Sequence, residues 1–395
     1  MKTLHILFLI IVLIISNQNK VLATPFGYVC NSGDGTVTVF DVATDTVTAT
    51  VTVGADPEDV AITPDGAFAY VTNNGSGNVS VIDTSTNTVT ATVTVGTGPY
   101  GVTITPDGSF AYVSNNSSSN VSVIDIGTNT VIATVPLTGF APQGIDTSVD
   151  GSKVYVVNNS SSTVDVISTG TNTVSTTIPL GLFEFPVDVA FAPDGSIAYV
   201  TNSAIPGSIS IIDVSSDTII GTIPGSLTVL EGPTIVDFSP DSTIAYVVDL
   251  PNSQIVIIDV SSSTISGTIS GTGTGYVVFT PDGQKAYVSG AGPSDSEVDD
   301  IDVGTSSITA TVQAGNNSRG IAITPLQQEL VVNGQCCTQK FLAQTETFVF
   351  LTWNAVTDGS NIVYVIFRDN IIIAYVTGTS YTDHNVAPCR SYVYE

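Results

Sequence analysis

Acidic side chains are the most abundant ionisable groups in this chain that could take part in chemistry. Asp and Glu number 35, against 8 Lys and Arg. Several aspartates follow short apolar runs, as at Asp83, Asp125, Asp213 and Asp259. Oxygen ligands of this kind suit Ca²⁺. Their regular recurrence favours the simpler interpretation that they are turn residues. We therefore assign no metal ligand and expect no cofactor, with Ca²⁺ as the open alternative.

Nucleophilic and acid–base catalysis lack their usual partners. Beyond the first 23 residues the chain has one histidine, His384, close to its end. Residues 24–333 therefore contain no histidine that could act as a base or a haem ligand. Cys30 would need a neighbouring base to act as a nucleophile, and the sequence offers none. We predict no catalytic residue and a structural role for Cys30.

A repeat must position whatever chemistry the chain has. One tyrosine context recurs seven times at intervals of 41 to 47 residues, at Tyr28, Tyr70, Tyr112, Tyr155, Tyr199, Tyr246 and Tyr287. A period of about 40 residues is typical of propellers and solenoids. An intact Pro-Asp-Gly triplet, which favours a tight turn, begins at Pro64, Pro106, Pro193 and Pro281.

Each copy contains four short runs with the composition of strands. Examples are 89–95, 100–105, 110–114 and 121–125, in which Val, Ile and Tyr alternate with small or polar residues. Four antiparallel strands in each copy make one propeller blade. The fold class is therefore all-β, with a seven-bladed β-propeller of four-stranded antiparallel blades over residues 24–333.

The order of strands predicts how the ring closes. The strand before Pro-Asp-Gly is expected to be innermost, so the chain starts in the middle of a blade. Residues 27–53 would supply three strands, and Arg319–Thr324 the missing inner strand. Joining them removes two open sheet edges.

The repeat resembles the YVTN β-propeller family over residues 26–333. Ala69-Tyr-Val-Thr-Asn73, Val81-Ile-Asp83 and Thr105-Pro-Asp-Gly108 carry the resemblance. It implies a propeller and little about activity, since such repeats occur in surface-layer, binding and enzymatic propellers. Haem-d1 propellers resemble this fold but need a histidine ligand. Metal-dependent lactonase propellers hold their ion with Glu, Asp and Asn near the channel.

A different module is expected after the repeat. Residues 334–340 are predicted to be a linker, and residues 341–395 resemble a fibronectin type III module, a small β-sandwich. Leu351, Trp353, Tyr364, Tyr392 and Tyr394 carry this resemblance. Such a sandwich needs about seven strands. We expect it to be incomplete, because Glu395 stands where the last strand would begin.

Residues 1–23 have the pattern of a signal peptide. Lys2 is followed by an apolar run at 6–15 and by Val21-Leu22-Ala23, which suits cleavage. We therefore expect a secreted, periplasmic or cell-surface protein with no membrane insertion after signal cleavage. The formal net charge of −27 argues against binding to nucleic acid or anionic membranes.

The four cysteines could pair in an oxidising compartment. Ring closure should bring Cys30 near the linker, so we predict a bond from Cys30 to Cys336 or Cys337. The remaining linker cysteine could hold Cys389. The spacing matches no zinc pattern.

One position in the inner strands varies while its neighbours stay small or apolar. Aligned on the Thr-Pro-Asp-Gly turn, this position holds Glu58, Tyr100, Gln143, Val187, Thr234, Gly275 and Arg319. We expect these residues to surround one mouth of the central channel. Glu58, Tyr100, Gln143, Thr234 and Arg319 are the candidate ligand-binding residues. Either Arg319 and Glu58 form a closing salt bridge, or Arg319, Tyr100 and Gln143 hold an anionic or sugar-like ligand, with Tyr100 as the stacking face.

These observations favour an exported, non-enzymatic recognition or scaffold protein that presents a propeller face to a protein or glycan. A lactonase-like, metal-dependent hydrolase is one alternative. A structural component of a cell-envelope array is another.

Overall fold

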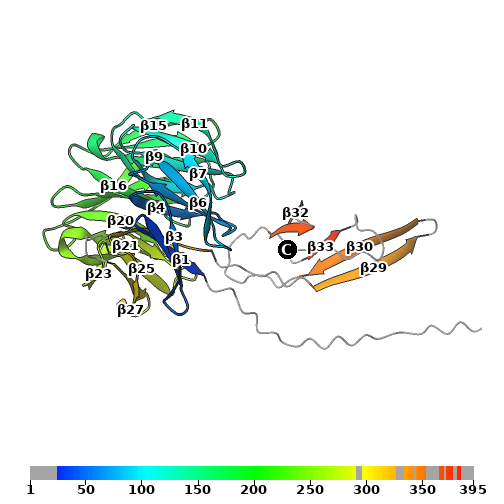
Figure 1. Ribbon diagram of the computed structural model, residues 1–395. Helices are drawn as coiled ribbons and strands as arrows, with labels where there is room; N and C mark the ends of the chain where they lie inside the picture. Colours follow the sequence, from blue (N-terminus) through cyan, green and yellow to red (C-terminus); the bar gives the residue numbers. More distant parts are fainter. Residues whose placement is uncertain are drawn as a thin grey trace, which may run out of the picture. The chain divides into compact units, whose positions relative to one another are not determined.

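The computed structural model describes residues 25–290 and 296–325 with their side chains. It also describes five strands between Asn333 and Asp383 by their backbone. The chain divides into two units, Thr24–Gln327 and a second unit that contains Gln328–Glu395. The first unit is a seven-bladed β-propeller in which every blade is a four-stranded antiparallel sheet (Figure 1).

Six blades are continuous in sequence, and each runs from an inner strand to an outer strand. Blade 1 consists of β4 (Pro57–Ile62), β5 (Phe68–Asn73), β6 (Asn78–Asp83) and β7 (Thr88–Thr94). Blade 2 consists of β8 (Pro99–Ile104), β9 (Phe110–Asn115), β10 (Asn120–Asp125) and β11 (Thr130–Pro136). Blade 3 consists of β12 (Pro142–Thr147), β13 (Lys153–Asn158), β14 (Thr163–Ser168) and β15 (Thr173–Pro179), with the short helix η1 (Asn159–Ser161) between β13 and β14.

The next three blades repeat this order. Blade 4 consists of β16 (Pro186–Phe191), β17 (Ile197–Asn202), β18 (Ser208–Asp213) and β19 (Thr218–Pro224). Blade 5 consists of β20 (Pro233–Phe238), β21 (Ile244–Asp249), β22 (Gln254–Asp259) and β23 (Thr264–Ser270), with the short helix η2 (Leu250–Asn252) between β21 and β22. Blade 6 consists of β24 (Val277–Phe279), β25 (Lys285–Ser289), β26 (Glu297–Asp302) and β27 (Ser307–Gln313).

Blade 7 combines both ends of the propeller. Its inner strand β28 (Ser318–Ile323) pairs with β1 (Phe26–Asn31), which is followed by β2 (Thr36–Asp41) and β3 (Thr46–Thr52). Gly27 pairs with Ile323 and Tyr28 with Ala322 in an antiparallel register. The predicted closure of the ring is therefore confirmed.

The turns between first and second strands show why the repeat folds in this way. In blade 1 the Thr63 hydroxyl donates to Asp65 at 2.6 Å, and Asp65 accepts the amide of Ala67 at 2.9 Å. Gly66 adopts a φ of 72°, which favours glycine. The side chain of threonine or serine, the aspartate and the glycine thus fix a hairpin without tertiary contacts.

The apolar core lies between neighbouring blades. One cluster, for example, joins Tyr70, Val79 and Val81 of blade 1 to Val113 and Ile124 of blade 2. All of these side chains are fully buried. Because each blade packs only against its two neighbours, the contacts between blades hold the ring together.

A buried tyrosine in five of the blades is hydrogen-bonded to the next blade. The hydroxyl of Tyr70 in blade 1 donates to Asn129 in blade 2 at 2.6 Å. We call this contact a tyrosine bridge. It recurs for the pairs Tyr28–Asn87, Tyr112–Asn172, Tyr155–Asp217 and Tyr287–Asp45. The acceptors have left-handed φ values of 52° or 53°, a conformation that Asn and Asp adopt more readily than most residues.

Lysines accompany the two bridges whose acceptor is an aspartate. Lys153 Nζ lies 2.8 Å from Asp217, and Lys285 Nζ lies 3.2 Å from Asp45. The tyrosines of blades 1 and 2 have asparagine acceptors. In these blades the position of the lysine is occupied by a phenylalanine, Phe68 or Phe110. The lysine compensates the partly buried negative charge that the aspartate adds.

The last two tyrosines face serines. Tyr199 faces Ser263 and Tyr246 faces Ser306. A serine side chain is shorter than an asparagine side chain, and both tyrosine hydroxyls lack a hydrogen-bond partner among the described residues. The interfaces between blades 4 and 5 and between blades 5 and 6 are therefore joined less completely than the others.

The second unit contains two small sheets. β29 (Asn333–Phe341), β30 (Gln344–Thr352) and β33 (Ser380–Asp383) form one, and β31 (Tyr364–Arg368) and β32 (Ile371–Val376) form the other. Residues 334–340, predicted to be a linker, lie within β29, because they pair with β30 over its whole length. The fibronectin type III resemblance stays a prediction, and Trp353, Tyr392 and Tyr394 among its residues lie outside the described part of the chain.

The predicted signal peptide also lies outside the described residues. Over the part of the chain that is described, no helix has the length and apolar character needed to cross a membrane.

Ring closure by β1 generates a testable prediction. Deleting residues 24–53 removes β1, β2 and β3 and leaves β28 with an unpaired edge. We expect the truncated protein to lose cooperative unfolding and to aggregate. Thermal melting combined with size-exclusion chromatography measures both effects. A truncated monomer that still melts in one sharp transition would show that closure is dispensable.

Candidate functional site

The inner strands of the seven blades surround the propeller axis. β28, β4, β8, β12, β16, β20 and β24 are the inner strands, and consecutive ones are neighbours in space. We call the face at which these strands begin the top face, and the opposite one the bottom face. In an antiparallel blade, the loop before the inner strand and the loop between its second and third strands lie on the top face.

The variable position identified in the sequence lies at the top of the inner strands. In six blades it is the second residue of the inner strand, as for Glu58 in β4 and Arg319 in β28. In blade 6 the position, Gly275, precedes β24. Hydroxyl groups fix the local backbone, because Thr72 donates to the carbonyl of Tyr100 at 2.7 Å and Ser289 to that of Arg319 at 2.6 Å.

Arg319, Glu58 and Tyr100 come together from blades 7, 1 and 2. Arg319 Nη1 lies 3.0 Å from Glu58 Oε1, and the Glu58 side chain is 6% exposed. The Tyr100 hydroxyl faces the same carboxylate. Burial raises the pKa of Glu58, while Arg319 and the Tyr100 hydroxyl act in the opposite direction. Arg319 therefore compensates the charge of the buried Glu58 carboxylate. It attracts an anionic ligand less strongly than an unpaired arginine would.

Gln143 and Thr234 lie on other parts of the ring. Gln143 is on β12, in the blade after that of Tyr100, and is partly exposed. Thr234 is on β20 in blade 5, and its hydroxyl donates to the carbonyl of Val248 at 3.4 Å. The described side chains thus form one connected group on blades 7, 1 and 2, with Gln143 next to it and Thr234 three blades away from Tyr100.

Four aspartates on the inner strands were not predicted as site residues: Asp59, Asp146, Asp188 and Asp237. Each accepts one backbone amide of its own strand and one from the inner strand of the next blade. Asp237, for example, accepts Phe238 N at 2.9 Å and Phe279 N at 2.8 Å. Inner strands of neighbouring blades do not pair directly, so these carboxylates satisfy amides that would otherwise lack an acceptor.

Burial shifts the pKa of these channel aspartates upward. It raises the pKa of Asp59 and of Asp237 to about 7, and that of Asp146 to about 6. Burial also raises the pKa of Asp188 well above its usual range. The bonds from backbone amides lower each pKa without cancelling the effect of burial.

The channel aspartates do not fit a Ca²⁺ site. Each already accepts two backbone amides, and in Asp59, Asp146 and Asp237 these bonds use both carboxylate oxygens. Within residues 25–290 and 296–325, no three or more His, Cys, Asp or Glu side chains are grouped as metal ligands. The recurring aspartates end the third strands of their blades and accept backbone amides of the turns that follow: Asp83, Asp125, Asp213 and Asp259.

Cys30 lies in the core between blades 7 and 1. It is fully buried in a cluster with Val37, Val60 and Val71. Burial raises the pKa of its thiol, and Asp59 and Glu58 add to the shift, so the reactive thiolate is disfavoured. The predicted bond to Cys336 or Cys337 stays a prediction, because those side chains and Cys389 lie outside the described residues.

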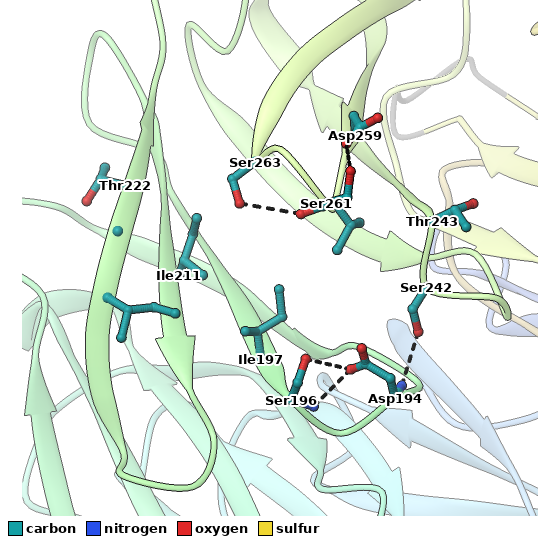
Figure 2. A pocket seen from close by; sticks show the side chains of 13 residues that line it. Asp194, Ser196, Ile197, Ile211, Thr222, Ser242, Thr243, Asp259, Ser261 and Ser263 are labelled. Carbon is teal, nitrogen blue, oxygen red and sulfur yellow. Dashed lines mark hydrogen bonds between the residues drawn. The ribbon is translucent and has the colours of Figure 1, made fainter.

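A groove of about 790 Å³ opens on the bottom face between blades 4 and 5 (Figure 2). Ile197, Ile211 and Ile220 provide apolar walls, and Asp194 and Asp259 lie at its rim, each bonded to a serine of its own turn. Two small residues open the groove. Gly221 replaces the alanine of blade 1, and Ser263 replaces the asparagine of the tyrosine bridge. Sequence reasoning missed the groove, although these two departures from the repeat were its signal.

Comparisons with known proteins agree with the fold. The family model for YNCE-like beta-propellers matches residues 17–111, and that for the 7-bladed beta-propeller lactonases matches residues 84–177. Each match covers less than half of the chain. Together with the seven blades they define the chain as a β-propeller protein. A search of curated proteins found no match.

Solved structures show the same architecture. A chain of hydrazine synthase from Kuenenia stuttgartiensis is similar with a TM-score of 0.61 and 22% identity, over 76% of this chain and 99% of that one. A functionally unknown protein from Desulfotomaculum acetoxidans DSM 771 has a TM-score of 0.64 and 20% identity, over 76% and 99%. The dihydro-heme d1 dehydrogenase NirN has a TM-score of 0.56 and 16% identity, over 75% and 74%. At these identities the similarity concerns the fold alone.

The channel aspartates predict an unusual dependence of stability on pH. Their pKa values of about 6 and 7 in the folded protein exceed the value of about 3.9 in an unfolded chain. Their contribution to stability is therefore complete below about pH 4 and is lost as the pH rises through about 7. We expect the free energy of unfolding to fall over this range, by on the order of a few kcal/mol for each aspartate.

Urea unfolding between pH 4 and 8 measures this dependence. Asp237→Asn should flatten the profile. Asp259→Asn, at the end of β22 where hydrogen bonds lower the pKa of the carboxylate, should leave the range above pH 5 unchanged. A wild-type stability that increases from pH 5 to pH 7 would contradict the assignment.

The incomplete bridge at Tyr199 predicts a stabilising substitution. Ser263→Asn should supply the missing acceptor, and asparagine suits the φ of 52° at this position. We expect a gain of about 1 kcal/mol in the free energy of unfolding. The reciprocal change Asn129→Ser should cost Tyr70 its acceptor and about as much stability. Equal stability of both variants and the wild type in urea unfolding would show that the bridges contribute nothing.

Proposed function

We propose that this propeller is an exported recognition protein that binds a protein or glycan ligand at the top mouth of its channel. The observation that carries the proposal is the ring of variable side chains on an otherwise regular set of inner strands. Packing between blades constrains the flanking residues, such as Val60 and Val102, which are 4% and 5% exposed. In the ring, Tyr100, Gln143, Thr234 and Arg319 are partly exposed and can vary with the ligand, whereas Glu58 is buried in its ion pair.

The geometry of the mouth supports a neutral, hydroxyl-rich ligand over an anion. Arg319 is already paired with the buried Glu58, so its charge is largely compensated. Tyr100 adds an aromatic face, and Gln143 adds an amide that can both donate and accept hydrogen bonds. Aromatic faces beside amide groups suit sugars, whose rings have apolar faces and hydroxyl edges.

The experiment compares glycan-array binding of the full chain with that of a Tyr100→Ala, Gln143→Ala variant. We expect the double variant to lose binding at least about tenfold while keeping a cooperative melt. Thr90→Ala with Thr48→Ala, on the outer strands, is the matched control. Arg319 is not replaced, because its loss would leave the buried Glu58 carboxylate without its positively charged partner. Unchanged binding by the double variant would place the ligand elsewhere.

A metal-dependent lactonase is the second candidate, favoured by the family match over residues 84–177. The geometry of the channel aspartates gives it no ligand set. Metal analysis of the purified protein, together with a screen for lactone hydrolysis, separates the two functions. Stoichiometric metal with turnover would favour the hydrolase and reject a purely recognising role.

A further inference from the structure

Large apolar side chains gather on one sector of the top face. Seven of them lie on its loops and are 42% to 85% exposed: Phe140, Leu182, Phe183, Phe185, Ile205, Leu227 and Leu250. We call the first six residues, which lie before blades 3 to 5 and within blade 4, the apolar crest. Phe140 precedes blade 3, residues 182–185 precede blade 4, Ile205 lies within blade 4, and Leu227 precedes blade 5. They share a face because each lies in a loop before an inner strand or between second and third strands.

The fold does not require these side chains. The loops before blades 1 and 2 have four residues each, including Gly54 and Gly96. The loop before blade 4 has six residues and the loop before blade 5 has eight. The longer loops thus add exposed apolar groups where other blades have small or polar ones. Exposed apolar patches of this kind commonly mark interaction sites.

The backbone at the crest is strained. Phe183 and Phe185 adopt φ values of 63° and 48°, and their ring centroids are 6.4 Å apart. A left-handed conformation costs a residue with a side chain about 1 kcal/mol or more. Two exposed phenylalanines thus lower stability without burying their rings. Such an arrangement indicates that the two rings serve to bind another molecule and not to stabilise the fold.

Hydrogen bonds hold the crest loops in place. Ser203 N donates to the carbonyl of Phe185 at 3.1 Å, and Ala204 N donates to that of Glu184 at 3.2 Å. From the same loop, Gly207 N donates to the carbonyl of Leu230, a fully buried residue in the loop before blade 5. These bonds fix the backbone that carries the apolar side chains, so less conformational entropy is lost when a partner binds.

Charge identifies the kind of partner. The crest loops, residues 137–141, 180–185, 203–207 and 225–232, contain Glu184 and Glu231 and no Lys or Arg. The whole chain has a net charge of −27. A second copy of the chain or an anionic membrane would be repelled. A segment that carries both apolar and basic side chains would be attracted.

We propose that the apolar crest is the docking surface for a polypeptide segment of apolar and basic residues. This proposal rests on the recognition function proposed above and assigns it a protein partner beside the channel mouth. The aromatic pair anchors the apolar side chains of the partner, and Glu184 and Glu231 attract its basic residues.

The test uses the full chain and an array of short synthetic peptides in which apolar content and net charge vary independently. We expect binding only to peptides that are both Leu- or Phe-rich and Lys-rich, with weaker binding at high salt. The variant Leu182→Ser, Phe183→Asn, Phe185→Asn should weaken this binding at least about tenfold. It should melt no lower than the wild type, since asparagine tolerates the left-handed conformation.

The matched control replaces three exposed apolar residues of the outer strands, Val47→Ser, Ile132→Ser and Ile220→Ser, and should bind as the wild type does. Equal binding of all peptide classes, or equal binding by the crest variant, would overturn the proposal. So would crest-dependent self-association in sedimentation, or crest-dependent binding to phosphatidylcholine vesicles. If the peptides fail while glycans still bind at Tyr100 and Gln143, the crest proposal alone is wrong. If neither binds, the recognition function fails as well.

Discussion

The ring depends on contacts that cross from one blade to the next, since each blade is a separate sheet. The tyrosine bridge supplies a directional contact at five of the seven interfaces, and apolar packing surrounds it. A buried hydroxyl without a partner is costly, so each tyrosine requires an acceptor at a fixed place in its neighbour. That requirement explains why Asn or Asp occupies the left-handed turn position in five of the blades, and why lysines appear where the acceptor is charged. The tyrosine side chain of one blade thus fixes where a turn of the next blade must lie.

The channel has a related constraint. Inner strands leave amides toward the axis that no neighbouring strand accepts, and aspartates bridge four of these gaps. Carboxylates that serve the backbone in this way are poor candidates for catalysis or metal binding. The positions that vary lie at the top mouth, where the inner strands begin.

Repeated features were sufficient to predict the blades, their strand order and the closure of the ring, because each recurs in the same place in every copy. The ring of variable residues was also predictable, since a constant offset from the turn locates it. The channel aspartates were not. Asp59 and Asp188 lie one residue after the ring position, whereas Asp146 and Asp237 lie three residues after it, so no single aligned position contains all four. The apolar crest and the groove at Ser263 were missed for a different reason. Both arise where a copy departs from the repeat, and their meaning depends on which loops share a face.

The two kinds of tyrosine bridge, with an asparagine or an aspartate as acceptor, also affect how the number of blades encoded by the gene could change. Blades 1 and 2 are nearly identical in sequence and present the same Tyr–Asn interface on both sides. Unequal recombination between their coding segments would add or remove a blade without creating a mismatched interface. The same event at blade 3 or blade 6 would place a lysine opposite an asparagine or leave an aspartate without its cation. Copy-number variation should therefore concentrate near the amino-terminal end of the propeller, and the lysine-bearing interfaces should mark the segments inherited as a unit.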